Sequence, residues 1–225
     1  MSFDLGVWFE SQRISSAQAA KKYNRLCVDQ DLSVLEAGDV RQFLADLTAL
    51  HSEPPADAGP WTAPPDVSDR HVIMPISWGR ANDVARQVLE LASRHDLVCF
   101  DPQVGVLHVP PSLRDPRGLL LKPCEGLSVA DPEPEVVNAA VRRISARNWF
   151  LILTEADQRY VQVGLGPDAG VGAGEFSLEF RDGSQDRHFR RVVEDRDEVR
   201  AFVGGFAADR HVDMDVQGWE KLDYW

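Results

Sequence analysis

The chain lacks the cysteine patterns of zinc sites and disulfide scaffolds. Its 225 residues contain three cysteines, Cys27, Cys99 and Cys124, and no C-x-x-C pair. Zinc sites and disulfide frameworks need closely spaced or even-numbered cysteines. We therefore expect no metal, no cofactor and a reducing compartment, the cytoplasm.

Long apolar runs are also missing. No stretch approaches the roughly 20 apolar residues that span a bilayer. The first ten residues, MSFDLGVWFE, are acidic and contain no basic region followed by an apolar run. We therefore expect neither a signal peptide nor a membrane partner.

Basic residues are few. The chain has 24 Lys and Arg against 36 Asp and Glu, so its formal net charge is −12. Such a protein should be repelled by nucleic acid and can attract a basic partner, although acidity also serves solubility alone. The imbalance is steepest between Asp29 and Asp69, where nine acidic residues accompany one basic residue, Arg41.

Motifs for metal and nucleotide chemistry are absent as well. The six histidines form no H-x-H or H-E-x-x-H pattern, which leaves a metal site little support. Five glycines between Gly164 and Gly174 superficially resemble a phosphate-binding loop. They lie between two predicted strands and no G-K-[ST] follows, so the nucleotide interpretation is weak.

Two alternating runs organise the C-terminal half. Residues 160–165 and 176–181 alternate polar and apolar, which is typical of strands with one buried face. The Gly-rich link between them predicts a mobile loop. Asp182-Gly183 then favours a hairpin turn into a third strand at 187–193. In this register Glu179, Arg181, His188 and Arg190 share the outer face.

Periodicity and capping signals predict the remaining elements. Strands are expected at 3–9, 71–77, 98–101, 104–109, 149–154 and 211–216, and helices at 15–27, 40–50, 83–95, 133–147 and 199–208.

This order predicts an α+β protein made of two small α/β sandwich domains. The domains would span 1–115 and 133–225, joined by a Pro-rich linker at 116–132. We expect antiparallel sheets with helices packed on one face. The β-α-α-β-α-β-β order of the N-terminal domain suggests a ferredoxin-like arrangement.

Two candidate sites follow. The stretch 51–69 contains five prolines, which exclude regular structure, and it is acidic. Its candidate partner-binding residues are Asp57, Trp61, Asp66 and Asp69. Trp61 could instead pin the loop to the domain.

The second candidate is the outer hairpin face. Glu179 and His188 could act as general base and acid, and Arg181 and Arg190 as a phosphate clamp, as in metal-independent ribonucleases. Facing charge pairs are, however, also the ordinary decoration of a solvated strand, and an acidic chain is badly suited to bind RNA.

The run YVQVG…GEFSLEFRDGSQDRHFRR…DEVRAFVGGFAADR resembles immunity proteins of bacterial polymorphic toxin systems. The resemblance covers roughly the last 75 residues and includes the hydrophobic-Gln-hydrophobic strand around Gln162, the hairpin 178–183, the helix 199–208 and Trp219. The first half is similar to an uncharacterised domain of actinobacterial proteins. The resemblance implies an acidic cytoplasmic binding protein and supplies no catalytic positions.

We therefore expect a non-enzymatic protein that neutralises a cognate, basic toxin by covering its surface. The alternatives are a hydrolase or nuclease-like enzyme using Glu179 and His188, and a ligand-binding regulatory module.

Overall fold

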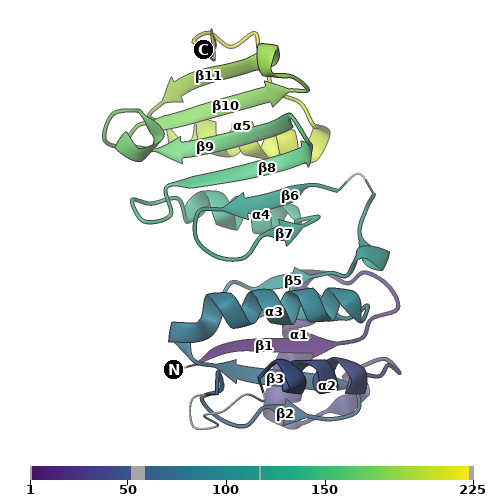
Figure 1. The fold of residues 1–225 in the computed structure, drawn as a ribbon. Coiled ribbons are helices and arrows are strands. Elements are labelled where there is room, and N and C mark those ends of the chain that lie inside the picture. Colours follow the sequence, from purple (N-terminus) through teal and green to yellow (C-terminus); the bar gives the residue numbers. More distant parts are fainter. Residues whose placement is uncertain (1, 52–58, 117, 223–225) are drawn as a thin grey trace. The chain divides into compact units, whose positions relative to one another are not determined.

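Two antiparallel sheets, one in each half of the chain, organise the fold (Figure 1). The computed structural model describes residues 2–51, 59–116 and 118–222. Contacts divide it into two units, Met1–Arg114 and Asp115–Trp225. Each unit combines one sheet with its own helices, which confirms the predicted α+β class.

The first unit carries a five-stranded sheet in the order β2-β3-β1-β4-β5. Its elements are β1 (Phe3–Trp8), α1 (Ser16–Asp29), the 3-10 turn η1 (Leu32–Val34), α2 (Arg41–Leu50), β2 (Asp66–Val67), β3 (His71–Ile76), the turn η3 (Trp78–Arg80), α3 (Ala81–Arg94), β4 (Val98–Asp101), β5 (Val106–His108) and the turn η4 (Pro111–Leu113).

The strand order β2-β3-β1-β4 is the one that a ferredoxin-like path produces, with β5 added at the edge. Helices α2 and α3 lie together on one face, where His95 at the end of α3 contacts the Asp46 carboxylate at 2.9 Å. Figure 1 shows α1 on the opposite face of this sheet. The expectation that all helices pack on one face is therefore wrong for this unit.

Helix α1 covers the second face because β1 is buried on both sides. Tyr23 and Leu26 of α1 form one core cluster with Trp8 of β1 and Phe100 of β4. A Cβ on Gly6 would lie 2.9 Å from the Tyr23 ring, so this glycine lets the helix approach the strand closely. Gly6 and Trp8 belong to the set that simple alternation assigns to solvent, which is why the sequence pattern concealed this layer.

The start of α1 follows its sequence signal. The Ser15 hydroxyl accepts a hydrogen bond from the Gln18 amide at 3.1 Å, and the Ser15 amide donates to Gln18 Oε1 at 2.8 Å. This reciprocal capping box satisfies two amides that a helix N-terminus otherwise leaves unpaired.

His108 on β5 makes the stability of the first unit depend on pH. Burial, with a smaller effect of Arg114, lowers the pKa of His108 to about 4. An unfolded chain binds the proton near pH 6.5, so stability should fall between about pH 6.5 and 4, by up to about 3 kcal/mol, and stay constant above this range. The free energy of unfolding of His108→Gln, measured against pH, should lack this fall. If the unmodified chain and His108→Gln have identical pH profiles, His108 is not the cause.

The second unit carries a seven-stranded sheet in the order β12-β11-β10-β9-β8-β6-β7. Its elements are β6 (Leu120–Pro123), β7 (Val129–Ala130), α4 (Pro134–Arg142), β8 (Phe150–Ala156), β9 (Arg159–Leu165), the turn η5 (Pro167–Ala169), β10 (Phe176–Asp182), the turn η6 (Gln185–Arg187), β11 (His188–Val193), α5 (Arg196–Asp209) and β12 (Glu220–Lys221).

Helices α4 and α5 lie side by side on one face of this sheet, as predicted (Figure 1). Phe206 of α5 is fully buried and its ring centroid lies 6.3 Å from that of Phe180 on β10. Val161 and Val163 of β9 are also fully buried, so the inward set predicted for this strand forms the core.

Three expectations about the second unit differ from the structure. The stretch 116–132, expected to be a linker, contains β6 and β7, because its prolines stand at strand ends and turns. The helix expected at 133–147 ends at Arg142 and begins after Glu133. The segment 211–216 forms no strand; the last strand described is β12, which pairs with β11.

Candidate partner-binding surface

The outer face of the second sheet, on the side away from α4 and α5, brings the predicted hairpin residues together. Cross-strand pairing sets Arg181 opposite Tyr160 and His188, and Glu179 opposite Gln162 and Arg190. The predicted register is thus correct. We call the face made by residues 150, 152, 154, 160, 162, 177, 179, 181, 188 and 190 the outer sheet face.

The side chains of this face are mostly half-buried, and two of them, Ser177 and His188, are buried. His188 has an exposed fraction of 1%, and its Nε2 lies 3.3 Å from Glu179 Oε2. The Tyr160 ring contacts it edge-on at 5.9 Å. Burial lowers the pKa of His188; Arg181 acts in the same direction and Glu179 opposes it. The histidine is therefore part of the packing, and its burial favours the neutral form, although the sequence pattern placed it in solvent.

Arg190 fastens the Gly-rich loop to this face. Its Nε donates to Ser177 Oγ at 2.8 Å, and its Nη2 donates to the carbonyls of Ala169 and Gly170 at 2.7 and 3.2 Å. Ser177 Oγ in turn donates to Glu179 Oε1 at 3.3 Å. These hydrogen bonds hold in place a loop that was expected to be mobile. The Arg190 guanidinium is therefore engaged within the protein.

Gly164 explains how close this loop comes to the sheet. A Cβ on Gly164 would lie 2.5 Å from the Cβ of Ala169, far inside van der Waals contact. The glycine of this strand is therefore required by the approach of the loop, and not by a phosphate ligand.

The acidic loop around Trp61 is tied down in its described part. Trp61 forms an isolated bridge with Ile76, and its ring packs edge-on against His51 at 5.4 Å. Trp61 is half-buried, so it pins the loop to the unit. Asp66 and Asp69 are exposed, and the Asp66 carboxylate lies 3.5 Å from His71 Nε2. Asp66 begins the short strand β2, so the expectation that this stretch has no regular structure is wrong at its end. Asp57 lies outside the described residues.

Part of the acidic charge between residues 29 and 69 is partnered. Asp31 pairs with Arg25, Asp39 with Arg41, and Asp46 with His95. Two of these three partners lie outside the stretch, which is why counting charges within it overstated its acidity. Asp66 and Asp69 remain as exposed candidates for partner contact.

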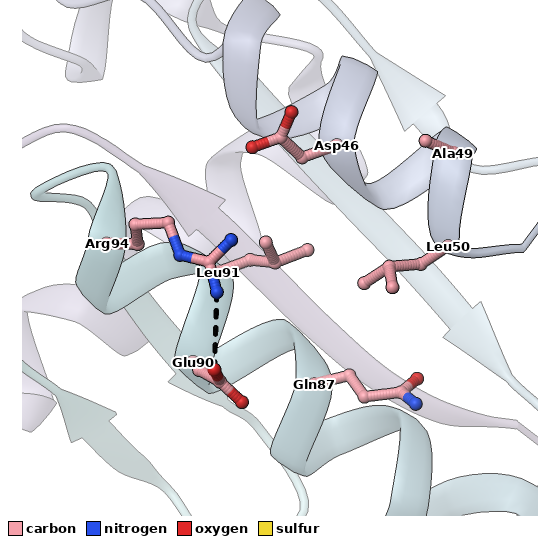
Figure 2. Close-up of a pocket in the computed structure, with 7 residues that line it drawn as sticks. All are labelled: Asp46, Ala49, Leu50, Gln87, Glu90, Leu91 and Arg94. Carbon is pink, nitrogen blue, oxygen red and sulfur yellow. Dashed lines mark hydrogen bonds and ion pairs between the residues drawn. The ribbon is translucent and has the colours of Figure 1, made fainter.

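A groove that the sequence did not indicate runs between α2 and α3 (Figure 2). It has a volume of about 570 Å³ and is lined by Asp46, Ala49, Leu50, Gln87, Glu90, Leu91 and Arg94. Leu50 on α2 is 52% exposed, whereas Leu91 on α3 is buried. The Glu90–Arg94 ion pair, at 3.3 Å, lies along α3 and lines one side of the groove. The open shape and mixed lining resemble a protein-contact groove more than a ligand cavity.

The described residues contain no group of three or more His, Cys, Asp or Glu placed to hold a metal ion. In the same part of the chain, no helix is long and apolar enough to cross a membrane. No family model, curated protein or solved structure significantly matches this chain.

Proposed function

We propose that this chain is a non-enzymatic binding protein of the immunity type, which neutralises a cognate, basic bacterial toxin in the cytoplasm by masking its surface. The observation that carries the proposal is the outer sheet face. It sets Tyr160, Arg181 and Glu179 in register on rigid strands, with no described helix of the second unit over them. Tyr and Arg are the residues that dominate binding energy at protein interfaces.

The charge of the chain supports a basic partner. A net charge of −12 attracts a basic protein to this chain and raises the rate of association. Affinity then depends on local packing and hydrogen bonding at the face, where Arg190 is already engaged with the loop. The resemblance of the last residues to immunity proteins points in the same direction.

The burial of His188 favours binding over catalysis. A general acid or base must come within about 3 Å of the proton that it transfers. With 1% of its surface exposed, the imidazole is out of reach of a bound RNA or peptide in this conformation. The nuclease-like alternative therefore needs a movement of the face that the binding function does not need.

Co-purification tests the proposal. The full chain, used as bait in a lysate of the organism that encodes it, should retain a basic protein at about one copy per bait, and the purified chain should inhibit the activity of that protein. Retention of nothing, or of a protein whose activity the chain leaves intact, would reject it. A hydrolytic activity of the chain that Glu179→Gln abolishes would establish the enzyme alternative.

Charge reversal in the acidic loop should slow the association. The candidate steering charges are Asp57, Asp66 and Asp69. Replacing Asp66 and Asp69 by Arg should lower the association rate about tenfold at low salt, with little change in the dissociation rate. Surface plasmon resonance with the captured partner at two salt concentrations measures both rates. If the association rate is unchanged, the loop does not steer the partner.

A further inference from the structure

A small apolar cavity lies in the second unit, between α5, the strands β10 and β11, and the segment 211–219. Its volume is about 310 Å³, at the lower end of the range for small-molecule sites. Leu178, Phe202, Val212, Val216 and Trp219 provide its apolar wall. This cavity belongs to the helix side of the sheet and is separate from the outer sheet face.

Two aromatic rings form one corner of the cavity. The Phe202 and Trp219 ring centroids lie 5.7 Å apart with the planes tilted by 47°. Trp219 Nε1 donates to the Asp213 carbonyl at 3.1 Å, which fixes the indole in the segment. A fixed aromatic wall favours flat apolar groups and attracts cations to the ring face.

The charges that line the cavity also favour a cation. The lining includes two acidic residues, Glu198 and Asp213, together with Arg191 and His211. The Asp213 Oδ1 atom accepts a hydrogen bond from the Asp215 amide at 3.0 Å. Arg191 already forms an ion pair with Glu198, and only 19% of its side chain is exposed. Because Arg191 and Glu198 compensate each other, Asp213 leaves the lining with an excess negative charge. An anionic ligand would have to displace Glu198 and would face Asp213, whereas a cationic ligand is attracted by Asp213 and by the aromatic corner.

We propose that this cavity binds a small amphipathic organic cation, an amine with an aromatic or branched aliphatic body. The cavity holds the volume of about ten water molecules, so the ligand has about as many non-hydrogen atoms. The apolar body packs against Phe202, Val216 and Trp219, and the ammonium group lies toward Glu198 and Asp213. This site is independent of the proposed toxin binding, and either can fail without the other.

Titration with two probes that share a phenylethyl body and carry opposite charges tests the proposal. The probes are 2-phenylethylammonium and 3-phenylpropionate, and the readout is the NMR resonance of the Trp219 indole N–H, which Trp219→Phe identifies. The cation should shift this resonance saturably with a Kd on the order of 1 mM or tighter, and the anion should bind at least about tenfold more weakly. Equal affinities, or no saturable shift with the cation, would overturn the proposal.

Two adjacent glycines provide the matched variants. Gly205 lines the cavity, and a Cβ there would meet only the His211 carbonyl, at 3.6 Å, so Gly205→Val should fold and occupy part of the space that the ligand needs. A Cβ on Gly204 would have no atom within 4 Å, and this residue does not line the cavity, so Gly204→Val is the control. Gly205→Val should abolish the shift and Gly204→Val should leave it unchanged. Glu198→Gln should weaken cation binding by about threefold to tenfold; cation binding that persists in Gly205→Val would place the ligand elsewhere.

Discussion

Phe206→Ala should unfold the second unit at a lower denaturant concentration and leave the first unit unaffected. Phe206 is fully buried, contacts Phe180, and has the Arg159 guanidinium 6.0 Å from its ring centroid. Removing such a ring costs about 3–5 kcal/mol, because apolar burial is lost and a cavity remains. Hydrogen exchange resolved by peptide measures the stability of each unit separately.

Phe43→Ala is the matched control in the first unit. Phe43 is also fully buried, and its ring contacts His95 edge-on at 6.4 Å. The same substitution should therefore lower the free energy of unfolding of the first unit by about the same amount and leave the second unit unaffected. If each substitution destabilised both units equally, the two cores would unfold as one cooperative system.

The second large effect concerns one substitution made at two glycines. Gly164→Ala should destabilise the second unit by about 2 kcal/mol or displace the Gly-rich loop, because the new Cβ meets the Ala169 Cβ at 2.5 Å. Gly204→Ala, inside α5 and with open space around it, should stabilise the same unit by up to about 1 kcal/mol, since alanine favours the helix.

Thermal unfolding of both variants, with hydrogen exchange of residues 166–175, provides the measurement. Opposite signs of the two changes are the expected result. A stabilising Gly164→Ala would mean that the loop does not lie against β9 in solution.

The sequence predicted features that depend on local pattern. The alternation of β9 and β10 gave the correct register of Glu179 with Arg190 and of Arg181 with His188, because apolar residues must all lie on one side of the sheet. The capping box at Ser15 likewise marked the start of α1, since its hydrogen bonds connect residues three positions apart.

Features that depend on distant segments escaped prediction. Nothing in the sequence near His188 indicates that Tyr160 packs against its ring, so an alternating strand wrongly suggested a solvated histidine. The sequence around Gly6 likewise does not indicate that Tyr23 packs against this glycine. The groove between α2 and α3 lies between helices that are distant in the chain, and Asp46 and His95, which are in contact there, are 49 residues apart. Tertiary packing decides all three, and no local propensity encodes it.

The most direct test of the central claim is a comparison of three baits in the co-purification. The unmodified chain is compared with Gln162→Lys, at the centre of the outer sheet face, and with Gln185→Lys, the same change on the exposed turn η6. An unmatched charge inside an interface costs several kcal/mol.

We expect the unmodified chain and Gln185→Lys to retain the basic partner at about equal amounts, and Gln162→Lys, shown to be folded by its thermal transition, to lose it. Equal retention by all three baits would show that the partner binds elsewhere and would contradict the assignment of the outer sheet face.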